Sequence, residues 1–185
     1  MKVIACAFPP DWAVRETLAL PVFLDQVPPK GLAGRIDFRL NGLISGLLLE
    51  RLLGKDDPWL LLNPERMVAP ELLLVPLGNH EALNLERVER WLNKTTDQLF
   101  AAGARSFALA VQDLYRPEFP SREFAGSLLR SLLRCQFELV KFYTDLDLAE
   151  KLVQEFSRWM YHYQSETPVE FSVRDIPEVF GAKDQ

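Results

Sequence analysis

The segment from Glu71 to Gln112 constrains the fold more than any other, because it has the pattern of one strand-helix-strand unit. A continuous apolar run, Glu71 to Leu77, ends at Gly78–Asn79, residue types that readily adopt positive φ angles. A helix is expected next, with Asn84 as its cap and apolar side chains at three- and four-residue spacing. The run Ser106 to Val111 is apolar on both faces, like a central strand covered by helices on each side. The two strands are therefore expected to be parallel and joined by a right-handed crossover.

The rest of the chain repeats this alternation. Further strands are predicted at residues 2–8, 17–24, 59–62, 137–143 and 169–173, and Pro21 marks the second of these as distorted or near an edge. One long helix is expected over residues 33–53, another capped by Ser121, and a third that starts at Thr144–Asp145. The prediction is an α/β fold, a three-layer α/β/α sandwich with a mostly parallel, mixed sheet whose C-terminal strand could be antiparallel at an edge.

Composition and length favour one domain over residues 1–185, with 181–185 as a frayed tail. The net charge of −5 makes a nucleic-acid partner unexpected. No apolar run reaches the roughly 18 residues of a membrane span, and the first one is too short for a secretory signal, so no membrane and a cytoplasmic location are expected. Cys6 and Cys135 are expected to be buried thiols rather than a disulfide.

In a parallel sheet, ligands bind beyond the carboxyl ends of the strands. The loops predicted at that edge are Gln26–Gly34, Gly78–Leu83 and Asp113–Pro120, and none carries a complete motif. His80, in the second of them, could act as a base but is interpreted as a solvated loop residue. The candidate ligand-binding residues are Gly31, Gly34, Gly78, Asp113, Tyr115 and Arg116.

Aromatic residues cluster from Trp159 to Tyr163, at the end of the last predicted helix. Five consecutive positions cannot all face inward on a helix, so Trp159, Tyr161 and Tyr163 are candidates for a protein interface. The alternative is that they pack against Pro168 and the last strand. If they form an interface, the partner is a second copy of the chain or another protein.

Several segments resemble the N-terminal domain of the leucine (cytosol) aminopeptidase family, which has a macro-domain-like fold. The resemblance extends to about Trp159 and is carried by Thr17–Asp25, Gly31–Asp37, Asn41–Ser45, Glu71–Gly78 and Asn84–Val88. The catalytic two-metal domain of that family, with its Asp-Ser-Gly-Gly and Asn-Thr-Asp-Ala-Glu-Gly-Arg segments, has no counterpart here. The resemblance therefore implies a stand-alone relative with no metal site, no cofactor and no peptidase activity.

Related macro domains bind ADP-ribose through glycine-rich loops. This chain keeps only Gly31 and Gly34 in the first loop, and Asp113–Pro120 contains no glycine, so ADP-ribose itself is not expected to bind. Two functions remain open. The first is non-catalytic protein association or regulation, and the second is binding of a small, nucleotide-like ligand at the strand ends, with an unrecognised enzymatic turnover left open.

Overall fold

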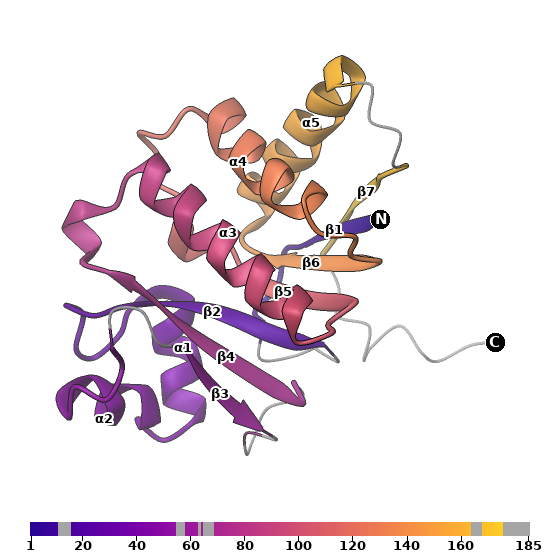
Figure 1. Ribbon diagram of the computed structural model, residues 1–185. Helices are drawn as coiled ribbons and strands as arrows, with labels where there is room; N and C mark the ends of the chain where they lie inside the picture. Colours follow the sequence, from indigo (N-terminus) through magenta and orange to yellow (C-terminus); the bar gives the residue numbers. More distant parts are fainter. Residues whose placement is uncertain (11–15, 55–57, 63, 65–68, 164–167, 176–185) are drawn as a thin grey trace.

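The computed structural model describes residues 1–10, 16–54, 58–62, 64, 69–163 and 168–175. Within them the chain forms one seven-stranded sheet with the strand order β3-β4-β2-β5-β6-β1-β7 (Figure 1). The strands are β1 (Lys2–Cys6), β2 (Thr17–Phe23), β3 (Trp59–Leu62), β4 (Glu71–Gly78), β5 (Ser106–Ala110), β6 (Leu139–Tyr143) and β7 (Glu170–Arg174). All the predicted strands are present, with ends that differ by at most two residues.

The sheet is parallel except for β3, which pairs antiparallel with β4 at one edge. The expectation that the C-terminal strand could be antiparallel is wrong, because β7 runs parallel to β1 with Lys2 opposite Glu170. The helix before β7 carries the chain back to the edge of the sheet at which the parallel strands begin, as a parallel crossover requires. Strand β2 is central, so Pro21 is not at an edge. It does lie in a distorted strand, whose register with β4 shifts between Val22 and Phe23.

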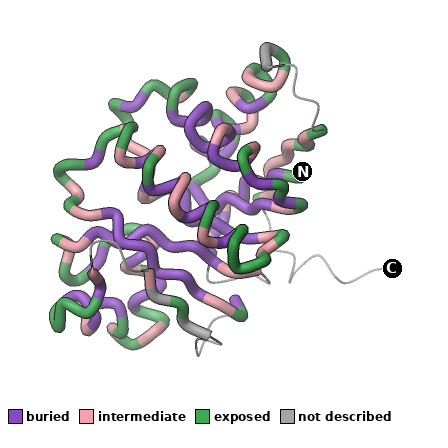
Figure 2. Tube along the Cα trace, viewed as in Figure 1, coloured by how far each residue is buried: buried purple, intermediate pink, exposed green. Residues whose placement is uncertain are grey.

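Helices cover both faces of the sheet, which confirms the three-layer α/β/α sandwich (Figure 1). One face carries α1 (Gly31–Arg39) and α2 (Leu43–Leu49), and the other carries α3 (Leu85–Ala101), α4 (Ser121–Leu133) and α5 (Leu146–Tyr163). Side chains of β2 alternate between the two layers: Leu18 and Leu20 belong to the α1/α2 core, and Ala19 belongs to the other. Figure 2 shows the strands buried between helices whose outer sides are exposed.

The single helix expected over residues 33–53 is wrong, because it is broken into α1 and α2. Asn41 and Gly42 have φ angles of 55° and 80°, which end the first helix. The side chain of Asp37 then accepts hydrogen bonds from the amides of Ile44 and Ser45 at 2.7 and 3.0 Å, and these bonds cap α2. The Asn-Gly pair was the visible signal of this break.

Of the predicted caps, Asn84 is confirmed, since its Oδ1 accepts from Arg87 N at 2.9 Å. Asp145 likewise caps α5 by accepting from Leu148 N at 2.8 Å. Ser121 is not a cap: Pro120 occupies that position, and its carbonyl receives the amides of Glu123 and Phe124. An aspartate or asparagine therefore marks the helix start here better than the serine does.

Both cysteines are buried and neither forms a disulfide, as expected. In the part of the chain that the structure describes, no helix has the length and apolar character of a bilayer span. The tail at 181–185 lies outside the described residues.

Candidate functional site

The three loops predicted at the carboxyl edge of the sheet are joined to one another by hydrogen bonds. Asp25, just beyond β2, accepts from the amide of His80 with Oδ1 at 2.9 Å and Oδ2 at 3.1 Å. Arg116, in the loop after β5, donates from Nη2 to the carbonyl oxygen of His80. Asp113, in the same loop, contacts the start of α1. The loops after β2, β4 and β5 therefore form one connected surface.

The contact between Asp113 and α1 is the central feature of this surface. Its Oδ1 accepts from the amide of Leu32 and its Oδ2 from the amide of Ala33, both at 3.0 Å. These amides belong to the first turn of α1, which has no acidic residue of its own and no side-chain cap from Lys30. The amides of a first helical turn are unsatisfied donors at the positive end of the helix dipole. A carboxylate from a distant loop thus fills a position that favours an anion.

Burial has the largest effect on the pKa of this carboxyl group. Desolvation raises the pKa of Asp113 above its usual value, and the amides of Leu32 and Ala33 and the nearby His80 oppose the rise. The balance shows that losing water outweighs the hydrogen bonds that the carboxylate gains.

Gly31 has the backbone that this contact requires. Its φ angle is 61°, and a Cβ atom there would lie 2.1 Å from Asp113 Oδ1. Gly34 serves its own loop instead, since a Cβ atom there would lie 2.4 Å from the carbonyl oxygen of Pro29. Gly78 ends β4 with a φ angle of 78° and accepts from the amide of Leu24 at 2.9 Å. Of the three glycines, Gly31 is the one placed against another candidate site residue.

The two large candidate residues, Tyr115 and Arg116, make different contacts. Tyr115 is half-buried and packs edge to face on Phe124 of α4, with ring centroids 5.2 Å apart, so it supports the loop from beneath. Arg116 is also half-buried, and its Nη1 lies 3.7 Å from Glu118 Oε1. Its Nε is buried and has no hydrogen-bond partner among the described residues. A buried orphan donor is costly, and a ligand acceptor would relieve that cost.

His80 is not the solvated loop residue that the sequence suggested. Its ring is half-buried and lies edge to face against Phe23, with centroids 4.8 Å apart. Asp25 and Gln112 were not among the predicted site residues. The Gln112 Nε2 donates to Asp145 Oδ2 at 3.2 Å, which links the loop after β5 to the start of α5. The available signal was position, because Asp25 and Gln112 directly follow strands of a parallel sheet.

A hollow lies beside the contact between Asp113 and the first turn of α1. Residues of the loop after β2 and of α1 line a depression of about 700 Å³, among them Pro28, Gly31, Gly34 and Asp37. Its size is that of a small-molecule site. The edge of the sheet therefore offers an anion-favouring helix start, a half-buried arginine with a buried Nε atom, and an adjacent hollow.

The aromatic cluster at the end of α5 is only partly exposed. Trp159 packs on α4: its Nε1 donates to the carbonyl of Arg122 at 3.1 Å, and the Arg130 guanidinium lies 5.6 Å from its ring centroid. Tyr161 is 85% exposed. The side chain of Tyr163 lies outside the described residues. Self-association or docking of a partner through these residues stays a prediction.

No protein-family model and no curated protein matches this sequence. Solved structures do match. The macrodomain of Thermus aquaticus DarG has a TM-score of 0.61 at 17% identity, over 78% of this chain and 98% of that one. A variant of the Oceanobacillus iheyensis macrodomain with ADPR has a TM-score of 0.61 at 11% identity, over 87% and 93%. Thermosipho africanus DarTG in complex with ADP-ribose has a TM-score of 0.54 at 17% identity, over 72% and 39%.

The chain thus has the fold of a macrodomain. The resemblance to the N-terminal domain of leucine aminopeptidases is wrong, because these structural neighbours and others, such as the macrodomain of Trypanosoma brucei, are macrodomains. The segments that carried the resemblance are buried strands and helix starts. Such positions are set by packing in a sandwich of this kind, so they do not separate one lineage with this fold from another.

Proposed function

We propose that the protein binds a small, nucleotide-like molecule at the carboxyl edge of the sheet, over the first turn of α1 and the loop Gln112–Pro120. The observation that carries the proposal is the pair of α1 amides that hold the carboxylate of Asp113 at this edge. Helix starts at the ends of parallel strands are common anion sites. The macrodomain fold and the two neighbours solved with ADP-ribose or ADPR support the nucleotide class.

In this proposal Asp113 decides which nucleotides bind. A ligand phosphate that reaches the amides of Leu32 and Ala33 meets a carboxylate already there, and like charges at about 4 Å cost a few kcal/mol near a protein surface. A nucleoside or a monophosphate that leaves this position to Asp113 avoids the cost. ADP-ribose, whose diphosphate would need those donors, is expected to be disfavoured by the wild-type chain.

Calorimetric titration with adenosine, AMP and ADP-ribose tests this function. The wild-type protein should bind adenosine or AMP, and ADP-ribose no more tightly than either. In Asp113→Asn the affinity for ADP-ribose should rise at least about tenfold, while that for adenosine changes less than about twofold. The control is Asp147→Asn, which removes one exposed charge from α5 and should change neither affinity.

Two results would overturn the proposal. One is the absence of heat with all three compounds at millimolar concentration. The other is tight ADP-ribose binding by the wild-type protein that Asp113→Asn does not improve, since Asp113 would then play no part in selection.

A further inference from the structure

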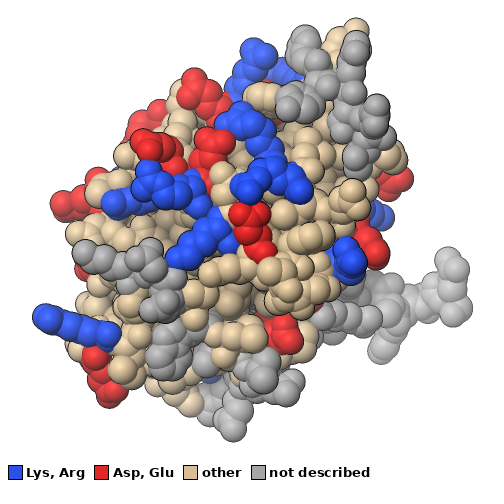
Figure 3. Space-filling view, viewed as in Figure 1, with Lys and Arg blue, Asp and Glu red and all other residues tan. Residues whose placement is uncertain are grey.

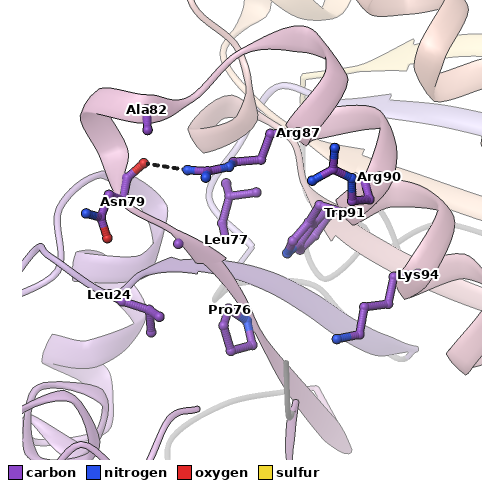
Figure 4. Close-up of a pocket in the computed structure, with 10 residues that line it drawn as sticks. Leu24, Pro76, Leu77, Asn79, Ala82, Arg87, Arg90, Trp91 and Lys94 are labelled. Carbon is purple, nitrogen blue, oxygen red and sulfur yellow. Dashed lines mark hydrogen bonds between the residues drawn. The ribbon is translucent and has the colours of Figure 1, made fainter. Parts of the chain in front are cut away.

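A second cavity lies on the other side of the loop after β4. It is a groove of about 340 Å³ between α3 and the second half of β4. Its lining residues are Leu24, Pro76, Leu77, Gly78, Asn79, Ala82, Arg87, Arg90, Trp91 and Lys94 (Figure 4). None of them belongs to the contact between α1 and Asp113, so the groove is separate from the site of the proposed function.

The groove lies beside the part of β4 with which strand β3 does not pair. Strand β3 pairs with Glu71–Leu74 only, so β4 continues past it from Val75 onward. The indole Nε1 of Trp91 donates to the carbonyl oxygen of Val75 at 3.2 Å. Pro76 has no amide hydrogen to offer. Pro76, Leu77 and Trp91 give the groove an apolar floor beneath α3.

The wall of the groove is basic. Arg87, Arg90 and Lys94 are three and four residues apart on α3 and share its groove side, and every titratable residue among the described lining residues is basic. Figure 4 shows Lys94 reaching from α3 toward Pro76, and Arg87 toward Asn79. Figure 3 shows Lys and Arg side chains gathered over α3 and α4, with acidic side chains between them. Such a concentration is notable in a chain of net charge −5.

The three cations of the wall differ in burial. Arg87 and Lys94 are half-buried, whereas Arg90 is exposed and pairs with Glu86 at 2.6 Å. Arg87 Nη1 makes one long hydrogen bond, 3.4 Å, to the carbonyl oxygen of Asn79. A guanidinium has five N–H donors, so this bond leaves most of them for another acceptor. Partial burial strengthens the attraction of both groups for an anion.

We infer that this groove binds a small organic anion, whose apolar body lies on Leu24, Pro76 and Trp91 and whose carboxylate or phosphate lies against Arg87 and Lys94. An apolar floor with a few polar groups that fix orientation is the usual composition of a small-molecule pocket, and the volume suits a single ring with its anionic group.

Nuclear magnetic resonance titration of the ¹⁵N-labelled protein tests the inference with three probes: phenyl phosphate, phenol and inorganic phosphate. Phenyl phosphate should shift the indole signal of Trp91 and the amide signals of Leu77 and Gly78. Phenol and inorganic phosphate should each bind at least about tenfold more weakly, because each lacks one half of the recognised chemistry.

Variants show whether the groove or the general surface charge binds the probe. Arg87→Gln and Lys94→Gln should each weaken phenyl phosphate binding about fivefold or more. Arg158→Gln is the control, because it removes one exposed cation from α5 that pairs with Glu155 outside the groove. Thermal unfolding of each variant shows whether it is folded, and either groove variant alone decides the question.

The inference is overturned if phenyl phosphate shifts none of the three signals at millimolar concentration, or if inorganic phosphate binds as well. It is also overturned if Arg158→Gln weakens binding as much as the groove variants do, because the probe would then respond only to net charge.

Discussion

Helices α1 and α3 both begin just beyond the carboxyl end of a parallel strand, but their first turns are capped differently. Asn84 caps α3 from the adjacent position, with its Oδ1 2.9 Å from Arg87 N. The first turn of α1 has no local cap and receives the carboxylate of Asp113, about 80 residues further along the chain. The local cap costs little chain entropy, whereas the distant one exists only after the sheet has formed.

The two caps also differ in the effect that they would have on an anionic ligand. Asn84 satisfies one amide and carries no charge, so it does not compete with an anionic ligand. Asp113 satisfies two amides and brings a negative charge to the edge where we propose that a ligand binds. In our proposal the cap of α1 both stabilises its helix and selects among ligands, whereas the cap of α3 only stabilises its helix.

The largest effect is expected from Gly31→Ala. A left-handed backbone costs an alanine about 1–2 kcal/mol, and the new Cβ would displace Asp113 and break both hydrogen bonds, for a total of about 3–4 kcal/mol. Chemical denaturation measures the loss. Gly46→Ala is the matched control, because nothing lies within 4 Å of that position and an alanine should stabilise α2 slightly.

A double variant separates the clash from the backbone strain. In Gly31→Ala/Asp113→Ala the clash is absent, so the loss of unfolding free energy should be smaller than the sum of the losses in the two single variants by at least about 1 kcal/mol. Full additivity would mean that Gly31 and Asp113 do not contact each other in solution.

Asp113→Ala should lower the free energy of unfolding by about 2 kcal/mol, because two amides of α1 lose their partner. Acetate should stabilise this variant more than the wild-type protein, because it supplies the missing carboxylate. Denaturant titrations with and without acetate measure this difference. Asp147→Ala is the control and should cost under about 1 kcal/mol, because its ion pair with Lys151 is exposed. Equal responses of Asp113→Ala and wild type to acetate would contradict a cap on α1 from Asp113.

Asn84→Ala should cost about 1 kcal/mol, the usual value of a single local cap. Asn84→Asp keeps the acceptor and should preserve stability. A loss in Asn84→Ala as large as that in Asp113→Ala would remove the distinction between the two helix starts.

The smallest effect is a pH dependence that only the cap of α1 should show. The pKa of Asp113 is raised by burial, so the folded state holds this proton more tightly than the unfolded chain does. The stability of wild type relative to Asp113→Asn should therefore increase as pH falls from above the raised pKa toward the ordinary carboxyl value of about 4. Denaturation at several pH values measures this difference, and a slope of opposite sign would show that the amides outweigh desolvation.

Local patterns were sufficient for most of the elements. The strands, the amphipathic stripe of α3 and the caps Asn84 and Asp145 follow from residues within a few positions of each other. The break between α1 and α2 was also encoded locally, in Asn41–Gly42, and was missed because the apolar spacing continues across it. The parallel direction of β7 depends on where α5 returns the chain, which no local pattern records.

The sequence alone placed Gly31, Asp113 and Arg116 at one edge of a parallel sheet, because strands of such a sheet end on the same side. Only the tertiary structure decided that Asp113 reaches the amides of α1, that Arg116 donates to His80, and that β3 pairs with only the first half of β4. The bonds of Asp113 join residues about 80 positions apart at distances of 3.0 Å. Periodicity fixes which face a side chain takes, but contacts at that range depend on how whole elements pack.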